Sequence, residues 1–371
     1  MGEKNAKRSA GKQKAKLVFL IVEIIIILTM MVVLYLVMNK TSEGPKVTYL
    51  DPKAVEIAPE VEEQKEEGGT MRGYMNIALF GLDAETESQL YKGSRSDTIM
   101  IASINLDTGD IKLVSVYRDS YLNIGPYKSG GKEVPEYYWK ANSAYSYGGA
   151  EQAVKMLNKN LDLDITDFVA VGYEGLRKVI DGLGGITIDI DSVELKHINN
   201  YQYTIATEVL DCDYTPVTKT GMQQVDGLQA AAYCRIRYTK GDDFARAARQ
   251  REVLRAIEAK AKETDLVTLT KVFNDCIENI YTSIDSDDIL ELIGNIMNYR
   301  IVEEGGFPDE SMRTTGNIGA KGSCVIPTDL ESNVVWLHQF LFDDEEYTVS
   351  GTVRECGEKI KSETDKYIKG K

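Results

Sequence analysis

Three predicted strands in the first half of the chain begin or end at charged residues. Their apolar runs are Met75 to Leu82, Thr98 to Leu106 and Ile111 to Tyr117, and a tight Asp-Thr-Gly-Asp turn joins the last two. If each strand runs back beside the one before it, one end of the sheet holds five charged side chains. These are Asp83, Arg95, Asp97, Arg118 and Asp119. Because surface ion pairs contribute only about 0–1 kcal/mol each, the cluster predicts a functional site; the alternative is a solvated ion-pair network.

A second group of cationic side chains follows later in the sequence. The alternation in Tyr233–Arg237 predicts a short strand with Arg235 and Arg237 on one face. A helix is predicted from Phe244 to Lys262, after a Gly-Asp-Asp sequence that can cap it. Its first turns place three side chains on one face, at i, i+3 and i+4: Arg246, Arg249 and Gln250.

Arginines near the start of a helix oppose its dipole, at a cost of about 0.3–1 kcal/mol each. The natural compensation is an anion bound between the helix start and the arginine-bearing strand. Several convergent guanidinium groups suit bidentate phosphate binding in a way that lysines would not. The group therefore predicts a phosphate site, with salt bridges to Asp242 and Asp243 as the alternative.

Aspartates beside a phosphate site suggest Mg²⁺, which prefers a few carboxylates together with water and phosphate oxygens. Asp83 and Asp97 are the expected ligands. Zinc hydrolysis and a Ser-His-Asp triad are disfavoured, because the chain has only His197 and His338 and neither lies in an H-E-x-x-H setting. No Walker or dinucleotide-binding glycine pattern occurs.

The elements that must position these residues alternate between strands and helices, which predicts a sheet covered by helices. The run from Thr98 to Leu106 has apolar residues at both odd and even positions, which predicts a central strand buried on both faces. A predicted helix from Glu174 to Gly182 leads through a glycine-rich turn into a strand at Ile186 to Ile190. Further helices are predicted at 149–160, 266–273, 287–297 and 333–342.

The composition is that of a globular protein, with 43% hydrophobic and 27% charged residues in a chain of 371. The formal net charge of -15 disfavours a polyanion such as DNA, so any anion site must be local. Five cysteines without a C-x-x-C pair argue against a zinc knuckle or a redox pair. They are either small buried hydrophobic residues or, outside the cytoplasm, members of one or two disulfides.

An apolar segment near the N-terminus, 17–38, is long enough to cross a hydrocarbon core of about 30 Å as a single transmembrane helix. Basic residues dominate 1–16, so the positive-inside rule predicts a cytoplasmic tail and an exported remainder. A cleaved signal peptide is the alternative, but the segment lacks a small-residue cleavage site. Beyond it we predict an acidic extracellular linker at 39–72, a folded core at 73–262 and a helical extension at 263–371 that packs on the core.

Several short motifs occur in a fixed order along the chain. They are Asn76–Asp83, Arg95–Thr98, Ser115–Asp119, Lys140–Tyr145 with Gly148-Gly149, Asp181–Gly185, and Arg235–Arg237 through Arg249-Gln250. In this order they resemble the LytR-CpsA-Psr family of Gram-positive cell-envelope proteins. The resemblance covers about Met75 to Lys262 together with the anchor and, more loosely, the C-terminal segment.

The resemblance implies a three-layer α/β/α fold with a central mixed sheet, and a Mg²⁺-dependent phosphotransferase. Such an enzyme moves a glycopolymer, for example teichoic acid or capsule, from polyprenyl pyrophosphate to peptidoglycan at the outer membrane face, with pyrophosphatase side activity. Asp83 and Asp97 would bind the metal, and Asp97, Arg118 and Asp119 would be catalytic. The phosphate-binding set expected from the motifs and the arginine group is Arg95, Arg118, Arg235, Arg237, Arg246, Arg249 and Gln250.

Two positions depart from the family pattern. In the family, the motif that ends at Asp83 usually continues with an arginine two places later, but this chain has Glu85 there. The motif at Ser115–Asp119 usually reads Pro-Arg-Asp, but this chain has Tyr117 in place of the proline. The lost cation leaves an alternative function, a non-catalytic binder of polyprenyl-phosphate lipids that acts as an envelope assembly factor. Nucleic-acid binding is not supported, because the exported part is acidic and shows no recognition helix.

Overall fold

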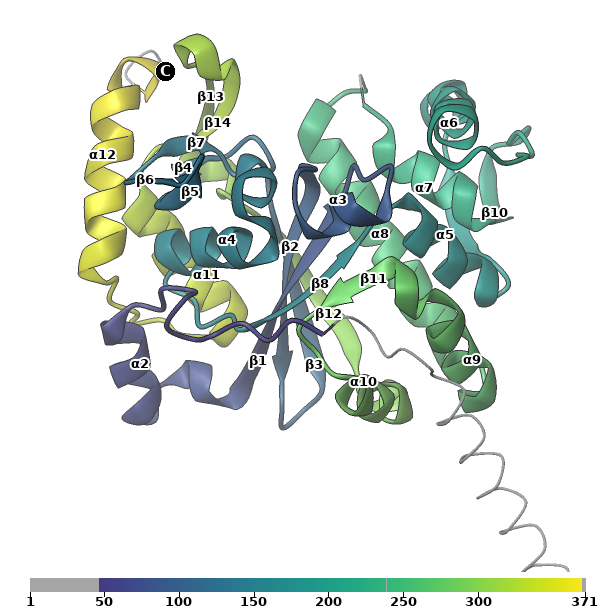
Figure 1. The fold of residues 1–371 in the computed structure, drawn as a ribbon, viewed down its shortest axis with the longest axis horizontal. Helices are drawn as coiled ribbons and strands as arrows, with labels where there is room; N and C mark the ends of the chain where they lie inside the picture. The colour runs from purple at the N-terminus through teal and green to yellow at the C-terminus, as the bar shows by residue number, and fades with distance from the viewer. Residues whose placement is uncertain (1–46, 238, 369–371) are drawn as a thin grey trace, which may run out of the picture. The chain divides into compact units, whose positions relative to one another are not determined.

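The centre of the fold is a six-stranded mixed sheet (Figure 1). The structure is a computed structural model, and it describes residues 47–237 and 239–368. The strand order is β11-β8-β1-β2-β3-β12. Their bounds are β1 Tyr74–Leu82, β2 Ser96–Asn105, β3 Asp110–Val116, β8 Asp167–Val171, β11 Ile280–Thr282 and β12 Arg300–Phe307. Strand β8 runs parallel to β1 and β12 runs parallel to β3, whereas the other neighbours are antiparallel.

Strand β2 lies in the interior of the sheet because both of its faces are apolar. Ile99 and Ile101 are buried in the large core on one face, and Ile104 belongs to a separate apolar cluster on the other. Successive side chains of a strand point to opposite faces, so a strand without a polar face must be covered on both sides. The predicted central strand is confirmed.

Helices cover both faces of the sheet and form the two outer layers (Figure 1). The first face carries α4 Ser143–Leu161 and α11 Leu330–Phe342, and α12 Gly351–Ile368 packs against these two helices. The second face carries α5 Tyr173–Gly182, α8 Asp242–Lys262 and α10 Ser286–Gly294. On the first face the ring of Phe80 meets Tyr145 of α4 edge-on at 5.4 Å. On the second, Arg251 of α8 donates to Oγ of Ser115 in β3 at 2.6 Å. The predicted α/β fold with a central mixed sheet is confirmed.

A smaller core lies beside the main sheet. It is built from β9 Ile186–Ile190, β10 Gly221–Val225, α6 Ser192–Thr204, the π-helix Ile205–Leu210 and α7 Gly227–Arg235. Their side chains bury Ile188, Ile198 and Ala231 with residues of α5 and α8. The predicted helix-turn-strand step from α5 into β9 is confirmed, but β9 pairs only with β10 and does not join the main sheet.

The remaining elements are short or peripheral. They are α2 Pro59–Glu66, α3 Glu87–Tyr91, α9 Leu266–Cys276, β4 Tyr121–Asn123, β5 Tyr127–Ser129, β6 Lys132–Val134, β7 Tyr138–Lys140, β13 Arg313–Asn317 and β14 Ser323–Pro327. Single 3-10 turns lie at Thr70–Gly73, Ile277–Asn279, Ile296–Asn298, Glu310–Met312 and Gly319–Lys321.

The predicted linker is wrong for residues 47–72, which belong to the main folded unit. Helix α2 forms in the acidic run and begins with a proline. Leu50, Val55 and Val61 are buried in the main core although the segment around them is polar. Glu56 also lies 3.5 Å from the amino groups of Lys155 and Lys159 in α4. A few fully buried apolar side chains therefore outweigh a disorder-like composition.

The helical extension predicted at 263–371 is also wrong in part. This segment contributes three helices of the expected kind, α9, α10 and α11, but it also supplies β11 and β12. These two strands form the opposite edges of the main sheet. Sequence periodicity missed β12 because five of its eight residues are charged or glycine, as an edge strand allows.

The strand predicted at Tyr233–Arg237 is the end of a helix instead. Asp226 begins α7 with a capping box, in which its side chain accepts from Gln229 N and Gln229 reaches back to the Asp226 backbone. The alanines that follow favour a helix, which continues to Arg235. Arg235 and Arg237 consequently lie at the helix end and in the loop after it.

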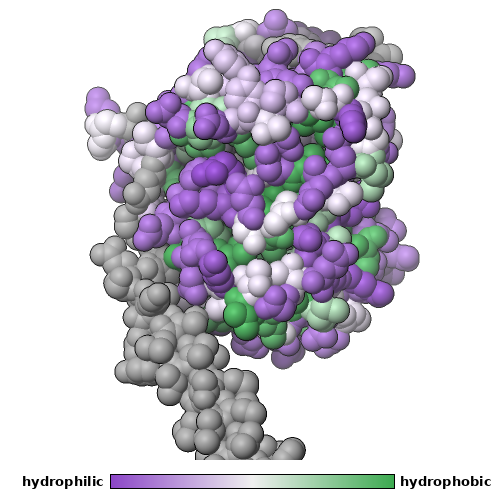
Figure 2. Space-filling model, turned by 90° about the vertical axis from the view of Figure 1, so that its right-hand side faces the viewer, coloured by the Kyte–Doolittle hydropathy of each residue, from purple (hydrophilic) through white to green (hydrophobic). Residues whose placement is uncertain are grey.

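The predicted anchor, 17–38, and the tail before it lie outside the described residues. In the part of the chain that is described, no helix combines the length and the apolar character needed to cross a bilayer. The face shown in Figure 2 is mainly hydrophilic, and polar side chains separate its apolar patches. All five cysteines are free thiols, and Cys276, Cys324 and Cys356 are buried, so the reading as small buried residues holds against the disulfide alternative.

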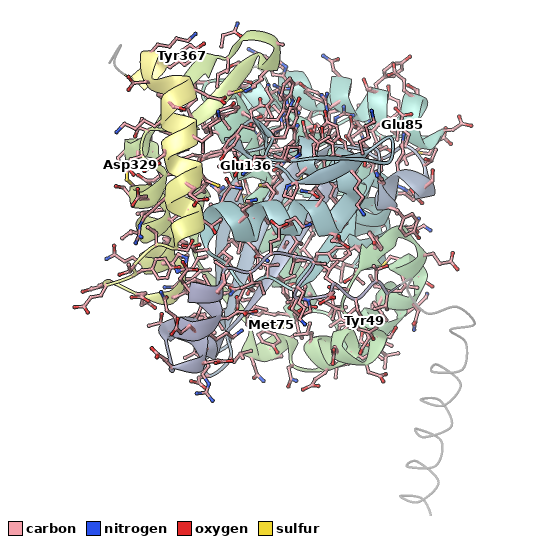
Figure 3. All side chains as sticks on the ribbon, turned by 60° about the vertical axis from the view of Figure 1, so that its left-hand side comes forward. Tyr49, Met75, Glu85, Glu136, Asp329 and Tyr367 are labelled. Carbon is pink, nitrogen blue, oxygen red and sulfur yellow. The ribbon has the colours of Figure 1, made fainter. Side chains whose placement is uncertain are left out.

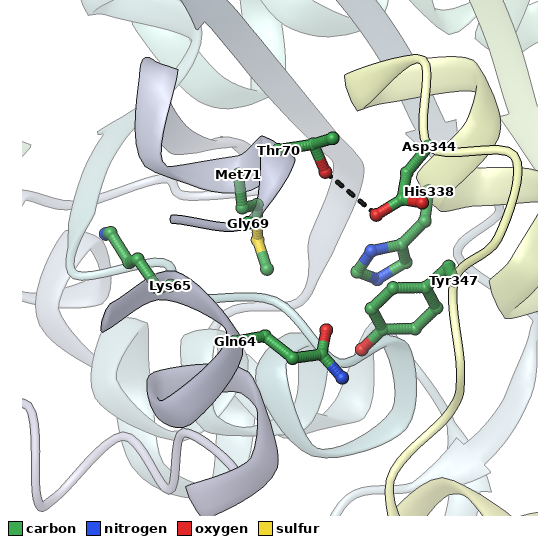
Figure 4. Close-up of a pocket in the computed structure, with 8 residues that line it drawn as sticks. All are labelled: Gln64, Lys65, Gly69, Thr70, Met71, His338, Asp344 and Tyr347. Atoms are coloured by element: carbon green, nitrogen blue, oxygen red, sulfur yellow. Dashed lines mark hydrogen bonds between the residues drawn. The ribbon is translucent and has the colours of Figure 1, made fainter. Parts of the chain in front are cut away.

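His338 on α11 is a buried packing residue. Its ring stacks on Tyr347 with centroids 3.5 Å apart, and its Nε2 lies 3.0 Å from the carbonyl of Leu161. The two rings line a small pocket against the segment after α2, where Thr70 donates to Asp344 at 2.8 Å (Figure 4). Residues 64–71 and residues from the C-terminal part of the chain therefore line this pocket together.

Acid is expected to destabilise the protein partly through His338. Burial lowers the pKa of its imidazole to about 4, from an ordinary value of about 6.5. The unfolded chain therefore binds a proton that the folded chain does not as the pH falls from about 6.5 to about 4, and the free energy of unfolding drops by up to about 3 kcal/mol. Urea unfolding at pH 7 and pH 5 should show a smaller drop for His338→Gln than for His197→Gln; equal drops would contradict this account.

Candidate functional site

The charged strand ends meet at one end of the sheet. Strand β1 finishes at Leu82, β2 starts at Ser96 and β3 finishes at Val116, and their antiparallel pairing brings these ends together. The backbone N–H of Asp83 donates to the Arg95 carbonyl at 3.2 Å. In Figure 3, Glu85 just beyond β1 lies far from Met75 near the start of that strand. The predicted grouping of charge at this end is confirmed.

Asp97 lies at the centre of the site, between two arginines from different elements. Nη1 of Arg118 donates to its Oδ1 at 2.8 Å. Nη1 of Arg246 lies 3.8 Å from its Oδ2, and Nη2 of Arg246 donates to the Asp97 carbonyl at 3.3 Å. The site thus combines a strand start, a strand end and the first turns of α8.

Asp243 completes this inner cluster from the first turn of α8. Its Oδ1 lies 2.7 Å from Nη2 of Arg246 and 3.5 Å from Nε of Arg118. The salt bridge proposed as the alternative to an anion site is therefore present. It neutralises the arginines that the helix dipole disfavours, and it holds both guanidinium groups in place beside Asp97.

Burial and charge act in opposite directions on these groups. Burial by itself lowers the pKa of Arg118, but the carboxylates of Asp97, Asp119 and Asp243 outweigh it and raise that pKa above its usual value. Arg246 is more deeply buried, and desolvation lowers its pKa despite the nearby Asp243. Burial raises the pKa of Asp243. The guanidinium groups of Arg118 and Arg246 are therefore partly dehydrated, which strengthens their attraction for an anion.

The segment that carries Arg118 and Asp119 is fixed through its backbone. The carbonyls of Arg118, Asp119 and Ser120 accept hydrogen bonds from the N–H groups of Asn142, Val325 and Ala141, at 3.0, 2.9 and 2.9 Å. The side chain of Asp119 also pairs with Nζ of Lys140, in β7, at 3.1 Å. The site is therefore preorganised, because its backbone is held from both sides.

A more exposed rim surrounds the inner cluster. Tyr173, at the start of α5, donates from its hydroxyl to Oδ1 of Asp83 at 2.7 Å, and Arg235 lies over the Tyr173 ring at 5.1 Å. Nη2 of Arg235 is 3.9 Å from Asp83, and Nε of Arg237 is 4.0 Å from Asp242. The side chain of Arg95 is exposed. At 3.9 and 4.0 Å these two ion pairs are longer than hydrogen bonds.

Arg249 and Gln250 do not line this rim. The guanidinium of Arg249 is buried and donates to Glu194 at 2.7 Å, to the Ile236 carbonyl at 3.1 Å and to Thr239 Oγ1 at 3.0 Å. Gln250 donates to the Cys234 carbonyl at 3.4 Å. Arg249 and Gln250 do share one face of α8, as their spacing predicted. That face contacts the end of α7 and the connection between α7 and α8, not the rim of the site. They hold the loop that carries the rim arginines.

The tyrosine that replaces the family's proline at the end of β3 is packed on three sides. Tyr117 meets the ring of Phe244 edge-on at 4.6 Å, and Arg313 lies over both rings, at 4.9 and 4.0 Å. The strand neighbour Gly306 gives it room, because a Cβ there would overlap the Tyr117 hydroxyl. Tyr117 therefore ties the strand end to the start of α8.

The sequence did not indicate a role for Tyr173 or Lys140, and it offered Asp243 only as a helix cap or as a salt-bridge partner of the arginines. The signal for Tyr173 was its place just after β8, whose parallel pairing with β1 brings it to the same end of the sheet as Asp83. Lys140 stands in one of the matching motifs. Both assignments depend on strand pairing, which residue spacing alone does not reveal.

The expected metal ligands, Asp83 and Asp97, are both at this end of the sheet. Across residues 47–237 and 239–368, no group of three or more histidine, cysteine, aspartate or glutamate side chains lies close enough to hold a metal ion. Mg²⁺ commonly binds through one or two carboxylates together with water and substrate phosphates. The donor set therefore fits Mg²⁺ only when a phosphate-bearing substrate supplies further oxygens.

Comparison with known proteins gives consistent matches. The model of the LytR_cpsA_psr family matches residues 34–319. Biofilm regulatory protein A of Streptococcus mutans is 29% identical over 241 residues, which cover 62% of this chain and 57% of the relative. The polyisoprenyl-teichoic acid–peptidoglycan teichoic acid transferase TagU of Enterococcus faecalis is 27% identical over 219 residues, covering 58% and 64%. The chain thus matches less than two thirds of either relative's length.

Solved structures share the fold. A Streptococcus agalactiae protein superposes with a TM-score of 0.60 at 24% identity, covering 78% of this chain and 94% of its own. TagT of Bacillus subtilis, solved with octaprenyl pyrophosphate, superposes with a TM-score of 0.50 at 20% identity, covering 81% and 97%. Because the family model spans most of the chain and the fold agrees, this protein is a member of the LytR_cpsA_psr family.

Proposed function

We propose that this protein transfers a phosphate-linked glycopolymer, such as teichoic acid or capsule, from a polyprenyl pyrophosphate carrier to peptidoglycan. The observation that carries the proposal is the inner cluster, in which Arg118 and Arg246 converge on Asp97. Two guanidinium groups held in a partly buried place suit a pyrophosphate. The names of the teichoic acid transferases among the relatives and the lipid bound to TagT support the same substrate class.

The reaction is a phosphoryl transfer. An acceptor hydroxyl attacks the phosphorus that carries the glycan, the bond from that phosphorus to the bridging oxygen breaks, and polyprenyl phosphate leaves. Arg118 and Arg246 stabilise the charge that grows on the phosphate oxygens, with Arg95, Arg235 and Arg237 on the outer phosphate. Asp119 is the proposed acceptor of the hydroxyl proton, because Asp97 is already assigned to the metal.

The proposed cofactor is Mg²⁺, held by Asp83 and Asp97 together with the pyrophosphate. When bound, it would neutralise phosphate charge and orient the leaving group. Tyr173 holds Asp83 from one side, and Arg118 and Arg246 hold Asp97 from the other. Pyrophosphate hydrolysis as a side reaction would follow whenever water replaces the acceptor hydroxyl.

The proposed location is the outer face of the cell membrane, with 17–38 as a single-pass anchor and a cytoplasmic N-terminus. The apolar segment and the basic residues before it support this orientation. A polyprenyl carrier resides in the bilayer, so an anchored enzyme meets its donor without leaving the membrane surface.

The test uses the full chain in detergent micelles with a polyprenyl-pyrophosphate-linked glycan and a peptidoglycan acceptor. Release of polyprenyl phosphate and labelling of the acceptor are expected, both lost with EDTA and restored by Mg²⁺. Absence of turnover by the unaltered protein would overturn the proposal. Tight lipid binding without metal-dependent cleavage would favour a non-catalytic assembly factor instead.

Tyr173→Phe is expected to lower turnover by about tenfold and to raise the Mg²⁺ concentration needed for half-maximal rate. The change removes only the hydroxyl that donates to Asp83, and misorienting a ligand through its partner typically costs about 10–100-fold. Tyr281→Phe, on β11, is the matched control. An unchanged Mg²⁺ dependence for Tyr173→Phe would remove Asp83 from the proposed metal site.

A further inference from the structure

Arg313, the first residue of β13, contacts two aromatic rings beside the site. Its Cζ lies 4.0 Å from the ring centroid of Phe244 and 4.9 Å from that of Tyr117. Its Nη1 donates to the Tyr117 hydroxyl at 3.3 Å and to the Pro308 carbonyl at 3.1 Å. Tyr117 is buried, and this donor satisfies its hydroxyl. We call the side chains of Arg313, Tyr117 and Phe244 the Arg313 clamp.

Each ring of the clamp belongs to a residue next in sequence to a member of the inner cluster. Tyr117 precedes Arg118, and Phe244 follows Asp243. The two rings meet edge-on, with centroids 4.6 Å apart and an interplanar angle of 86°. Because consecutive Cα atoms are only about 3.8 Å apart, a displacement of either ring also displaces the neighbouring residue of the site.

The start of α8 needs support from outside the helix. Its N-cap is Gly241, which has no side chain to accept from the N–H groups of the first turn. Asp242 has a φ of 41°, in the left-handed region that residues other than glycine rarely adopt. Yet this turn carries Asp243, whose carboxylate joins the two inner arginines. Packing of Phe244 in the clamp holds the turn in place of a cap.

The hairpin that carries Arg313 is itself fixed to the site. Strand β13 pairs with β14, where Arg313 lies opposite Pro327. In β14, the N–H of Val325 donates to the Asp119 carbonyl at 2.9 Å. The hairpin therefore contacts the end of β3 twice, through its backbone at Asp119 and through the Arg313 side chain at Tyr117. Arg313 thus holds Phe244 from an element that is already in register with the site.

We propose that Arg313 is a positioning residue for the phosphoryl transfer: it holds Phe244 and thereby keeps Asp243 between the two inner arginines. The inference rests on the function proposed above. A planar guanidinium group stacks on an aromatic face while its N–H groups bond other partners, a combination that a lysine ammonium does not reproduce. In this role Arg313 acts through Phe244 and does not touch the substrate.

Arg313→Met is the first test, because methionine keeps an apolar stem and removes the cation and its N–H donors. The ligand titrated is methylenediphosphonate, a pyrophosphate analogue that is not hydrolysed, with Mg²⁺ and the full chain in detergent micelles. Affinity should fall by about tenfold, since a cation–π contact and its hydrogen bonds are lost. Arg313→Gln, which keeps one N–H donor, should show the same loss. Unchanged affinity in either folded variant would overturn the proposal.

A double-substitution cycle shows whether Arg313 acts through Phe244. Phe244→Leu keeps an apolar side chain but removes the ring face, and it should also lower the affinity for methylenediphosphonate by about tenfold. In that background Arg313→Met should add less than about a twofold loss, because the contact is already gone. Losses that multiply to about a hundredfold would show that Arg313 acts by another route, and would overturn the proposal.

Arg354→Met is the matched control. Arg354 is another arginine of the C-terminal part and donates to the Val349 carbonyl at 2.9 Å, but it lies on α12 and is exposed. Its replacement should leave the affinity for methylenediphosphonate within about twofold, because the field of an exposed charge is screened. An equal loss in Arg354→Met would mean that total positive charge matters, and would overturn the role of the clamp.

The transfer assay separates positioning from general stability. Arg313→Met should lower kcat by about tenfold and leave KM for the peptidoglycan acceptor unchanged, because the clamp supports groups that stabilise the transferring phosphate. A role in stability alone would lower the free energy of unfolding without changing kcat of the folded protein. An unchanged kcat with a raised acceptor KM would overturn the proposal.

The two proposals fail differently. Absence of turnover by the unaltered protein would overturn the transferase function and leave the methylenediphosphonate result standing. Equal affinity of Arg313→Met and the unaltered protein for methylenediphosphonate would overturn the clamp and leave the transferase function standing.

Discussion

Arg118→Ala is expected to lower glycopolymer transfer by at least about 10³-fold while the protein remains folded. The guanidinium pairs with Asp97 at 2.8 Å, Asp243 at 3.5 Å and Asp119 at 3.9 Å, so it links all three inner carboxylates. Removing one preorganised donor to a developing oxyanion costs about 10²–10³-fold in turnover. Here Asp97 and Asp119 would also lose their orientation, which adds to the loss.

Arg300→Ala provides the matched control for this prediction. Arg300 also pairs with an aspartate, Asp110, but at the opposite end of the same sheet, and its side chain is exposed. Transfer by Arg300→Ala should stay within about twofold of the unaltered protein, because exposed ion pairs contribute little. Substantial transfer by a folded Arg118→Ala protein would mean that the phosphate site lies elsewhere.

Arg249→Met is expected to destabilise the protein by about 3–5 kcal/mol, the cost of leaving one member of a buried ion pair without its partner. The partner, Glu194, and Arg249 are 7% and 8% exposed. Arg249 also holds the Ile236 carbonyl and Thr239 Oγ1, so its loss releases the loop after α7. Urea unfolding measures the change directly.

A double substitution separates stability from the position of the loop. Glu194→Leu with Arg249→Met removes both charges and should recover most of the lost free energy of unfolding, because apolar replacements of a buried pair are often neutral. Glycopolymer transfer by this double variant should still be low, because neither replacement side chain can donate to the Ile236 carbonyl and hold the loop. A stable Arg249→Met protein with only a raised donor KM would instead restore Arg249 to the phosphate-binding set.

The sequence was sufficient to predict that the charged ends of the first three strands meet. Runs of apolar residues located β1, β2 and β3 to within two residues at each end, and the antiparallel return of short strands brought Asp83, Asp97 and Arg118 together. That success has a local cause, because adjacent strands joined by short loops pair with their neighbours. Tyr173 was missed because its strand, β8, comes more than eighty residues after β1 and pairs with it in parallel.

Other errors arose where tertiary contacts override local pattern. Tyr233–Arg237 alternates like a strand, but the capping box at Asp226 and the alanines after it start a helix that runs through the alternation. The acidic segment around α2 resembles a disordered linker in composition, yet Val55 and Val61 are fully buried. In each case a few specific contacts decided the structure, and average composition did not report them.

The two outer strands of the main sheet have a consequence for how the protein is made. Strands β1, β2 and β3 emerge early in synthesis, but the free edges of β8 and β3 receive their partners only when β11 and β12 have been translated. Until residue 307 is available, the nascent chain therefore presents open sheet edges, which invite aggregation. Completion of the sheet depends on contacts between distant parts of the sequence, so folding is expected to be slow and largely post-translational.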